Sequence, residues 1–200
     1  PEGNTEYLIY QTLVGAWPLD EQHVPEFRER MKAYLLKATR EAKTHTSWIN
    51  PNDDYEGAVQ AFVDAIMSDG DNPFLSDFRE FERATRWYGA LNSLTQVLLK
   101  ITSPGVPDIY QGNELWDFSL VDPDNRRPID YSLRSRLLDQ LQASSPDLAE
   151  LLANWTDGRI KLWLTQAALT FRRDHPALFL DGEYLPLQVT GPHAGHLVAF

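Results

Sequence analysis

A helical repeat of apolar residues runs through most of this 200-residue chain and constrains its fold more than any other feature. From Pro25 to about Lys43 the apolar positions stay on one helical face, and they are Phe27, Met31, Tyr34, Leu35, Ala38 and Ala42. The same pattern predicts a short helix that carries Tyr7, Leu8, Gln11 and Thr12, and further helices over residues 55–66, 74–101, 133–142, 146–153 and 160–173. The sequence therefore predicts a mainly α fold.

Local signals set the expected helix ends. Asn4 is predicted to cap the first helix, which should close near Gly15, and Asn50 to Asp53 supply turn and cap residues before the third. The stretch 74–101 is predicted to be either two helices or one helix bent near Gly89.

Short β segments are expected at two places. Prolines and glycines bracket Asp108-Ile109-Tyr110, a strand too short to stand alone, so it would belong to a larger sheet. A turn between two helices explains this pattern equally well. After His175-Pro176 the sequence alternates over 183–189 and 196–200, which indicates a domain boundary. We therefore expect three regions, residues 1–102, 103–175 and 176–200.

Composition excludes several classes of protein. A net charge of −11 disfavours a nucleic-acid or anionic-membrane partner, and the absence of cysteine excludes disulfides, thiolate nucleophiles and zinc ribbons. No apolar run approaches the roughly 20 residues that span a bilayer, and no signal-peptide pattern occurs, so a cytoplasmic location is expected. The chain begins at Pro1 without methionine and stops inside a predicted strand, so we expect it to be part of a longer protein.

Two segments carry candidate site residues. At the end of the first predicted strand lie Tyr110, Gln111, Asn113 and Glu114, in the place where parallel α/β barrels build their sites. The second segment follows a helix and contains His45, Thr46, Ser47 and Trp48, which suit a polyhydroxylated ligand with the indole stacked on a sugar face. Alternatively, this is a helix end with Trp48 in the core.

Other chemistries lack support. Asp122 and Asp124 lack the ligand order of a calcium loop, and with Arg126 and Arg127 nearby they indicate a charge-paired turn in a long polar loop of about 20 residues. The sequence shows neither a nucleophile elbow nor a phosphate-binding glycine pattern. We predict no metal site and no cofactor.

At these residues the sequence resembles a known family. Segment 105–114 is similar to the region of the eighth barrel strand in the α-amylase superfamily (glycoside hydrolase family 13). More narrowly, several stretches resemble the maltooligosyltrehalose synthase family, and these are residues 6–18, 40–48, 105–117, 119–128 and 172–184.

The resemblance implies the C-terminal part of a (β/α)₈ barrel. Residues 1–102 would be a helical insertion and barrel helices, 103–175 the last strand, a long loop and the final helices, and 176–200 the start of a β domain. The parent enzyme would be an intramolecular glucosyl transferase (an isomerase) that turns the reducing-end α-1,4 bond of a maltooligosaccharide into an α,α-1,1 bond, in trehalose biosynthesis.

Catalytic residues are not expected in this chain. Family members use an aspartate nucleophile, a glutamate acid/base and a stabilising aspartate after barrel strands four, five and seven, and the His-Asp-Thr-type motif of the last is missing. The rim of the pocket would comprise Asp108, Tyr110, Gln111, Asn113 and Glu114. We expect His45, Thr46, Ser47 and Trp48, with Tyr110, Gln111 and Asn113, on the acceptor side.

Two rival interpretations stay open. The chain is alternatively a non-catalytic helical module that binds carbohydrate or protein through Trp48, Trp116 and Tyr110, or part of another α-amylase-superfamily hydrolase or transferase. The chain alone is expected to be inactive. It is also expected to self-associate, because a long helix such as 74–101 would expose an apolar face.

Overall fold

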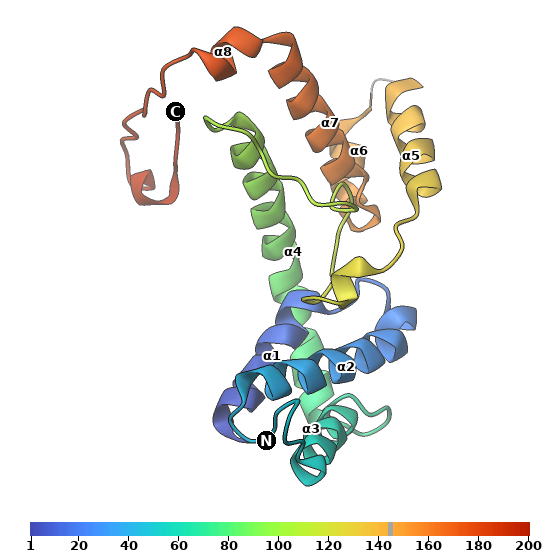
Figure 1. The fold of residues 1–200 in the computed structure, drawn as a ribbon. Helices are drawn as coiled ribbons and strands as arrows, with labels where there is room; N and C mark the ends of the chain where they lie inside the picture. Colours follow the sequence, from blue (N-terminus) through green and yellow to red (C-terminus); the bar gives the residue numbers. More distant parts are fainter. Residues whose placement is uncertain (144–145) are drawn as a thin grey trace. The chain divides into compact units, whose positions relative to one another are not determined.

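The computed structural model describes residues 1–143 and 146–200, and eight α-helices dominate that part of the chain (Figure 1). They are α1 (Gly3–Ala16), α2 (Val24–Ala42), α3 (Asp53–Ile66), α4 (Pro73–Thr102), α5 (Tyr131–Ala143), α6 (Leu148–Ala153), α7 (Arg159–Asp174) and α8 (Pro176–Leu180). Short 3₁₀ turns are η1 (Glu21–His23), η2 (Asp124–Arg126), η3 (Trp155–Asp157) and η4 (Ala194–His196). The predicted mainly α fold is confirmed.

The helix ends follow from local residues. Pro25 lies in the first turn of α2, and Lys43 ends that helix in the left-handed region with φ 56°. The side chain of Asn52 accepts a hydrogen bond from the Tyr55 N–H and caps α3, as predicted. Asn4 is not a cap, because the Glu2 carboxylate accepts from the Thr5 N–H and takes that role for α1.

The chain forms two compact units. Unit 1 consists of residues 1–90 and 116–131, and unit 2 consists of residues 91–115 and 132–200. Of the two alternatives predicted for 74–101, two separate helices are wrong, because one helix, α4, spans the stretch and contributes residues to both units.

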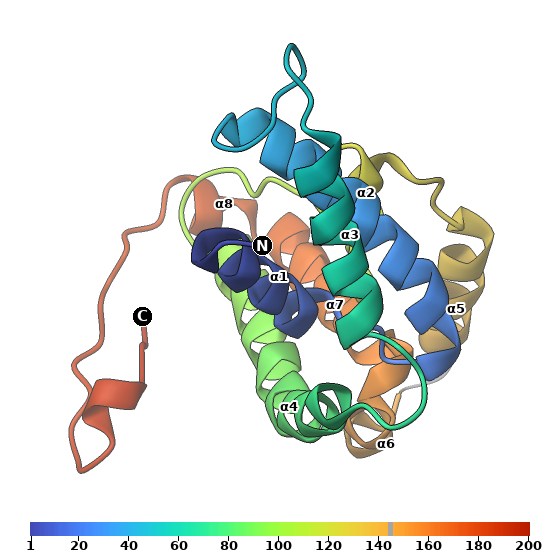
Figure 2. The same ribbon diagram turned by 90° about the horizontal axis from the view of Figure 1, so that it is seen from below.

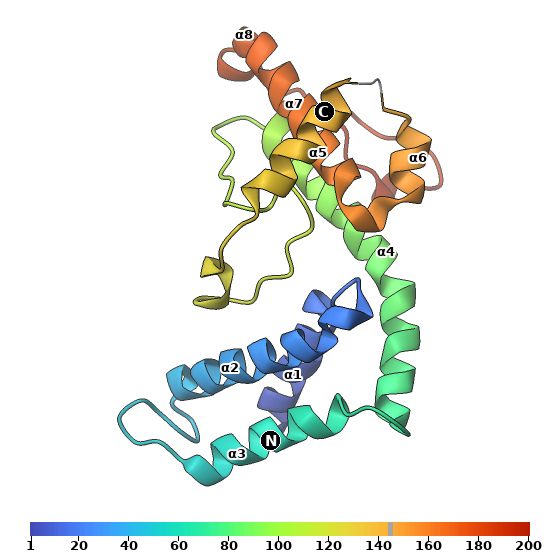
Figure 3. The ribbon, with the colours of Figure 1, turned by 90° about the vertical axis from the view of Figure 1, so that its right-hand side faces the viewer.

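Helices α1, α2 and α3 and the first part of α4 enclose the core of unit 1. Figures 2 and 3 show α2 and α3 side by side, joined by the loop 43–52. The Trp17 ring meets Phe27 and Phe78 edge-on, with centroids 5.9 and 4.9 Å apart. Of the stripe predicted on α2, Phe27, Met31 and Leu35 are fully buried, Tyr34 and Ala38 are half-buried, and Ala42 is exposed.

Unit 2 has its own smaller core. Its buried apolar side chains are Ile101, Leu115, Leu141, Leu151, Ile160 and Leu162. Arg172 of α7 donates hydrogen bonds to the carbonyls of Ile101, Ser103 and Gly105, which lie at and beyond the C-terminus of α4. The first of these bonds satisfies a carbonyl in the last turn of α4, and the other two fix the chain that follows the helix.

The predicted strands do not form within the described residues. Residues 106–110 have no regular secondary structure, and a β-strand needs neighbours to supply a hydrogen-bonding ladder. Near the C-terminus residues 176–180 are helical, and a backbone hydrogen bond from the Leu187 N–H to the Ala199 carbonyl joins the two predicted segments after them. The prediction of short β segments is therefore wrong for this part of the chain.

Candidate functional site

A buried carboxylate organises the segment that contains the first group of candidate residues. Glu56, in the first turn of α3, is 7% exposed and accepts two hydrogen bonds from Arg40 of α2, over 2.8 and 2.7 Å. The Thr46 hydroxyl donates a third, over 2.5 Å, and itself accepts from the Asn52 N–H. The bonds from Arg40, and then that from Thr46, lower the pKa of Glu56. The loop is thus fixed to both helices that flank it.

Trp48 lies on the surface of this loop. The Arg40 guanidinium carbon is 5.0 Å from the centroid of the indole, a cation–π distance, yet 55% of Trp48 is exposed. The alternative prediction that Trp48 belongs to the core is therefore wrong. Ser47 lies beside it, and its hydroxyl accepts from the Asn50 N–H over 2.9 Å.

His45 borders a pocket of about 260 Å³ in unit 1. The pocket is lined by α1, the end of α2 and the start of α3; its lining includes Glu2, Leu8, Gln11, Ala42 and Thr44 besides His45 and Tyr55. The His45 and Tyr55 rings stack with centroids 4.8 Å apart, and His45 Nε2 lies 3.7 Å from a Glu2 oxygen. The lining of the pocket therefore combines apolar side chains, such as Leu8 and Ala42, with polar ones, as ligand pockets do.

Glu2 is held ionised in that wall. Desolvation raises its pKa, but hydrogen bonds from the Tyr55 hydroxyl over 2.6 Å and from Thr5 outweigh it and lower the pKa from 4.5 to about 2. Desolvation and the bond to Glu2 together raise the pKa of Tyr55. Near neutral pH the pocket thus presents a carboxylate and a protonated phenol.

The second group of candidate residues belongs to unit 2. Asp108, Tyr110 and Gln111 are exposed, and Asn113 and Glu114 are half-buried. Glu114 forms an ion pair of 3.1 Å with Arg134 of α5, whose guanidinium also donates to the Gly112 carbonyl over 2.6 Å. The structure thus brings this group together as one turn, separately from the group at 45–48, which belongs to unit 1.

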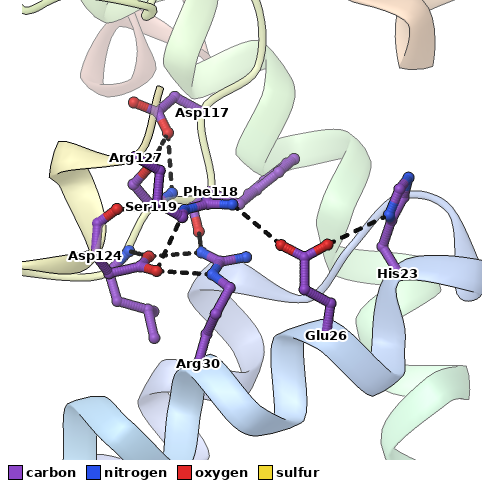
Figure 4. Close-up of polar contacts among 9 residues, drawn as sticks. His23, Glu26, Arg30, Asp117, Phe118, Ser119, Asp124 and Arg127 are labelled. Atoms are coloured by element: carbon purple, nitrogen blue, oxygen red, sulfur yellow. Dashed lines mark hydrogen bonds and ion pairs between the residues drawn. The ribbon is translucent and has the colours of Figure 1, made fainter. Parts of the chain in front are cut away.

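The polar loop after this group is anchored by a residue that the sequence does not reveal. Arg30 of α2 donates hydrogen bonds to both carboxylate oxygens of Asp124, over 2.8 and 2.7 Å, and a third to the Phe118 carbonyl over 2.8 Å (Figure 4). Arg127 pairs with Asp124 and Glu26. The predicted charge-paired turn is confirmed, but its partner Arg30 lies 94 positions before Asp124 and has no local signal.

Among the residues that the structure describes, no three His, Asp or Glu side chains are grouped so that they could hold a metal ion. In residues 1–143 and 146–200, no helix has the length and apolar character needed to cross a membrane.

Comparison with known proteins gives these residues a context. No family model matches the chain. Two Mycobacterium tuberculosis proteins, each provisionally named a maltooligosyl trehalose synthase, are 40% identical to it over 200 residues, which is 100% of the chain. A crystal structure of a maltooligosyl trehalose synthase covers 94% of the chain with a TM-score of 0.83 at 39% identity. The chain resembles one portion of a maltooligosyl trehalose synthase.

The likeness extends to a second solved structure. The maltooligosyltrehalose synthase from Arthrobacter ramosus covers 96% of the chain with a TM-score of 0.80 at 38% identity. The predicted resemblance is confirmed over the whole sequence, so both groups of candidate residues lie inside it. The chain spans 24% of the length of the M. tuberculosis relatives and 25% of the first crystal structure. It therefore corresponds to a part of these maltooligosyl trehalose synthases.

Proposed function

We propose that this chain is part of an enzyme that acts as a maltooligosyltrehalose synthase. The observation that carries the proposal is similarity in both sequence and structure over one and the same stretch, with 40% identity across 200 residues and a TM-score of 0.83. A freestanding binding module is less well supported, because the relatives are enzymes by name and the chain spans 24% of the M. tuberculosis proteins.

The proposed reaction rearranges the reducing end of a maltooligosaccharide without net gain or loss of atoms. The α-1,4 bond to the last glucose breaks, its 4-oxygen takes a proton from the enzyme's acid, and the glycosyl group passes to a carboxylate nucleophile. The anomeric hydroxyl of the released glucose then attacks, gives its proton to the same acid/base and frees the carboxylate. An α,α-1,1 bond results. The carboxylates that do this would lie outside this chain.

Residues of this chain would hold the released glucose and keep water out during that exchange. Exposure and ring geometry support Trp48 and His45 as contacts, and the exposed Asp108, Tyr110 and Gln111 as rim residues. The Thr46 hydroxyl donates a hydrogen bond to Glu56 of α3, and the Ser47 hydroxyl accepts one from the Asn50 N–H within the loop. Their proposed part is therefore to shape the loop that presents Trp48.

The wider architecture is proposed on the same basis. Residues 106–110, which have no regular structure in this chain, would form a strand of a (β/α)₈ barrel completed by chain outside this sequence, and residues 176–200 would begin a β domain. A cytoplasmic location is part of the proposal, and a chain without cysteine fits a compartment in which disulfides are rare.

The test follows the reducing ends of the substrate. The full-length protein that contains this chain is incubated with maltopentaose. Isomerisation should lower the concentration of reducing ends without releasing much glucose, and the anomeric proton of an α,α-1,1 bond should appear in the NMR spectrum. A hydrolase would raise the reducing ends, and a binding module would leave them unchanged. Either result would overturn the proposal.

A further inference from the structure

The Trp48 side chain is exposed yet anchored on one face. The Trp48 residue is 55% exposed, and the Arg40 guanidinium carbon lies over the indole ring, 5.0 Å from its centroid. Because the guanidinium covers one face while more than half of the residue stays accessible, the opposite face is the part open to another planar or ring-shaped partner. Exposed aromatic residues of this kind are common anchors in binding sites.

The Arg40 side chain is itself fixed by the carboxylate of Glu56. Its Nε and Nη2 donate to the two oxygens of Glu56 over 2.8 and 2.7 Å, a bidentate geometry that fixes the plane of the guanidinium. The Glu56 carboxylate is 7% exposed and is further bound by the hydroxyl of Thr46, two residues before Trp48. The Glu56 carboxylate therefore fixes both the Arg40 guanidinium, which lies against the indole, and the loop backbone next to Trp48.

We propose that Arg40 and Glu56 are positioning residues that hold the Trp48 indole as a stacking platform for a pyranose ring of the maltooligosaccharide. This inference rests on the proposed function and deepens it, since it names how one sugar contact is built. The apolar C–H face of a glucose ring suits the open indole face, while its equatorial hydroxyls stay free to bond elsewhere. Preorganising the indole lowers the entropy lost on binding.

A lysine at position 40 would not do the same. It keeps the positive charge but lacks the flat fork, so it can neither bind both carboxylate oxygens at once nor place a planar cation over the indole. Arg40→Lys is therefore a conservative variant that should weaken the platform without emptying a buried site. Arg159→Lys is a matched control, because Arg159 is also partly buried and paired with two carboxylates, Glu150 and Asp157.

The experiment is a double-mutant cycle in the full-length protein. Affinity for maltopentaose with sulfur in place of its glycosidic oxygens, which resists turnover, is measured by calorimetry for wild type, Arg40→Lys, Trp48→Ala and the double variant. We expect Trp48→Ala to weaken binding about tenfold and Arg40→Lys about threefold, amounts typical of aromatic contacts. In the Trp48→Ala background Arg40→Lys should then have no further effect. Trp48→Phe should retain most of the affinity, and Arg159→Lys all of it.

Two results would overturn the inference. One is an unchanged affinity in Trp48→Ala, and the other is an equal loss from Arg40→Lys with and without Trp48, which would make the role of Arg40 merely structural. Because binding is measured without turnover, these outcomes are separate from a failure of the wild-type enzyme to make a non-reducing product. If the wild-type enzyme makes the non-reducing product, Arg40→Lys should also raise the ratio of hydrolysis to isomerisation about threefold. This increase should be absent when Arg40→Lys is added to Trp48→Ala.

Discussion

The Arg30–Asp124 pair should be the main tie between the 116–131 loop and α2. Replacing Asp124 with alanine removes the acceptor of two bonds from Arg30 and of the bond from the Leu120 N–H, which is 2.6 Å long. Breaking one side of a buried pair costs about 3–5 kcal/mol. The two side chains are 16% and 10% exposed, and water recovers part of that cost, so we expect about 2–3 kcal/mol.

Hydrogen–deuterium exchange in the loop measures this loss directly. At 1.4 kcal/mol for each factor of ten, the Leu120 amide should exchange about 30- to 150-fold faster in Asp124→Ala than in wild type. Arg126→Ala is the control in the same loop, because Arg126 is 71% exposed in its pair with Asp122 and should contribute at most about 1 kcal/mol. Unchanged exchange at Leu120 in Asp124→Ala would refute the reasoning.

The Arg30–Asp124 pair makes the stability of the 116–131 loop depend on pH. Desolvation raises the pKa of Asp124, but bonds from Arg30 and from Leu120 outweigh it, and the folded-state pKa lies below the ordinary 3.8. The stabilisation is therefore complete above pH 3.8 and is lost as the pH falls through the lowered value. In wild type the protection of the loop amides, which is the intrinsic exchange rate at the same pH divided by the observed rate, should fall only in that acid range.

Three further results are expected. The Glu2 carboxyl should titrate near pH 2 in carbon-detected NMR, and Tyr55→Phe should move its pKa up towards 4.5; an unshifted titration in that variant would contradict the hydrogen bond. Lys43→Gly should stabilise the chain by about 0.5–1 kcal/mol in thermal melts, because position 43 has φ 56°, and a loss of stability would count against that conformation. Thr46→Val should cost about 1–3 kcal/mol, since it leaves Glu56 short of a buried donor, and a neutral effect would argue against the network.

The sequence predicted helices well because their signals are local. The stripe of Phe27, Met31 and Leu35 is visible in one window, and the ends of α2 fall within a residue or two of the prediction. Asn52 was identifiable as a cap. The error at Asn4 arose because Glu2 also has an oxygen within reach of the first free N–H groups.

What the sequence could not supply was pairing between distant positions. Arg40 and Glu56 lie 16 residues apart on neighbouring helices, and Arg30 and Asp124 lie 94 apart, so no periodicity links them. The strand predicted at Asp108–Tyr110 failed for the related reason that a strand is defined by its neighbours. The candidate residues His45 and Trp48 were named from their chemistry, but the exposure of Trp48 and the role of Arg40 required the fold.

The most direct test of the account is a crystal structure of the full-length protein with the sulfur-linked maltopentaose bound. The account predicts one glucose ring lying parallel to the Trp48 indole at van der Waals distance, about 4 Å, with the Arg40 guanidinium on the opposite face. A maltooligosaccharide bound elsewhere, with Trp48 covered by other parts of the protein or free in solvent, would contradict it.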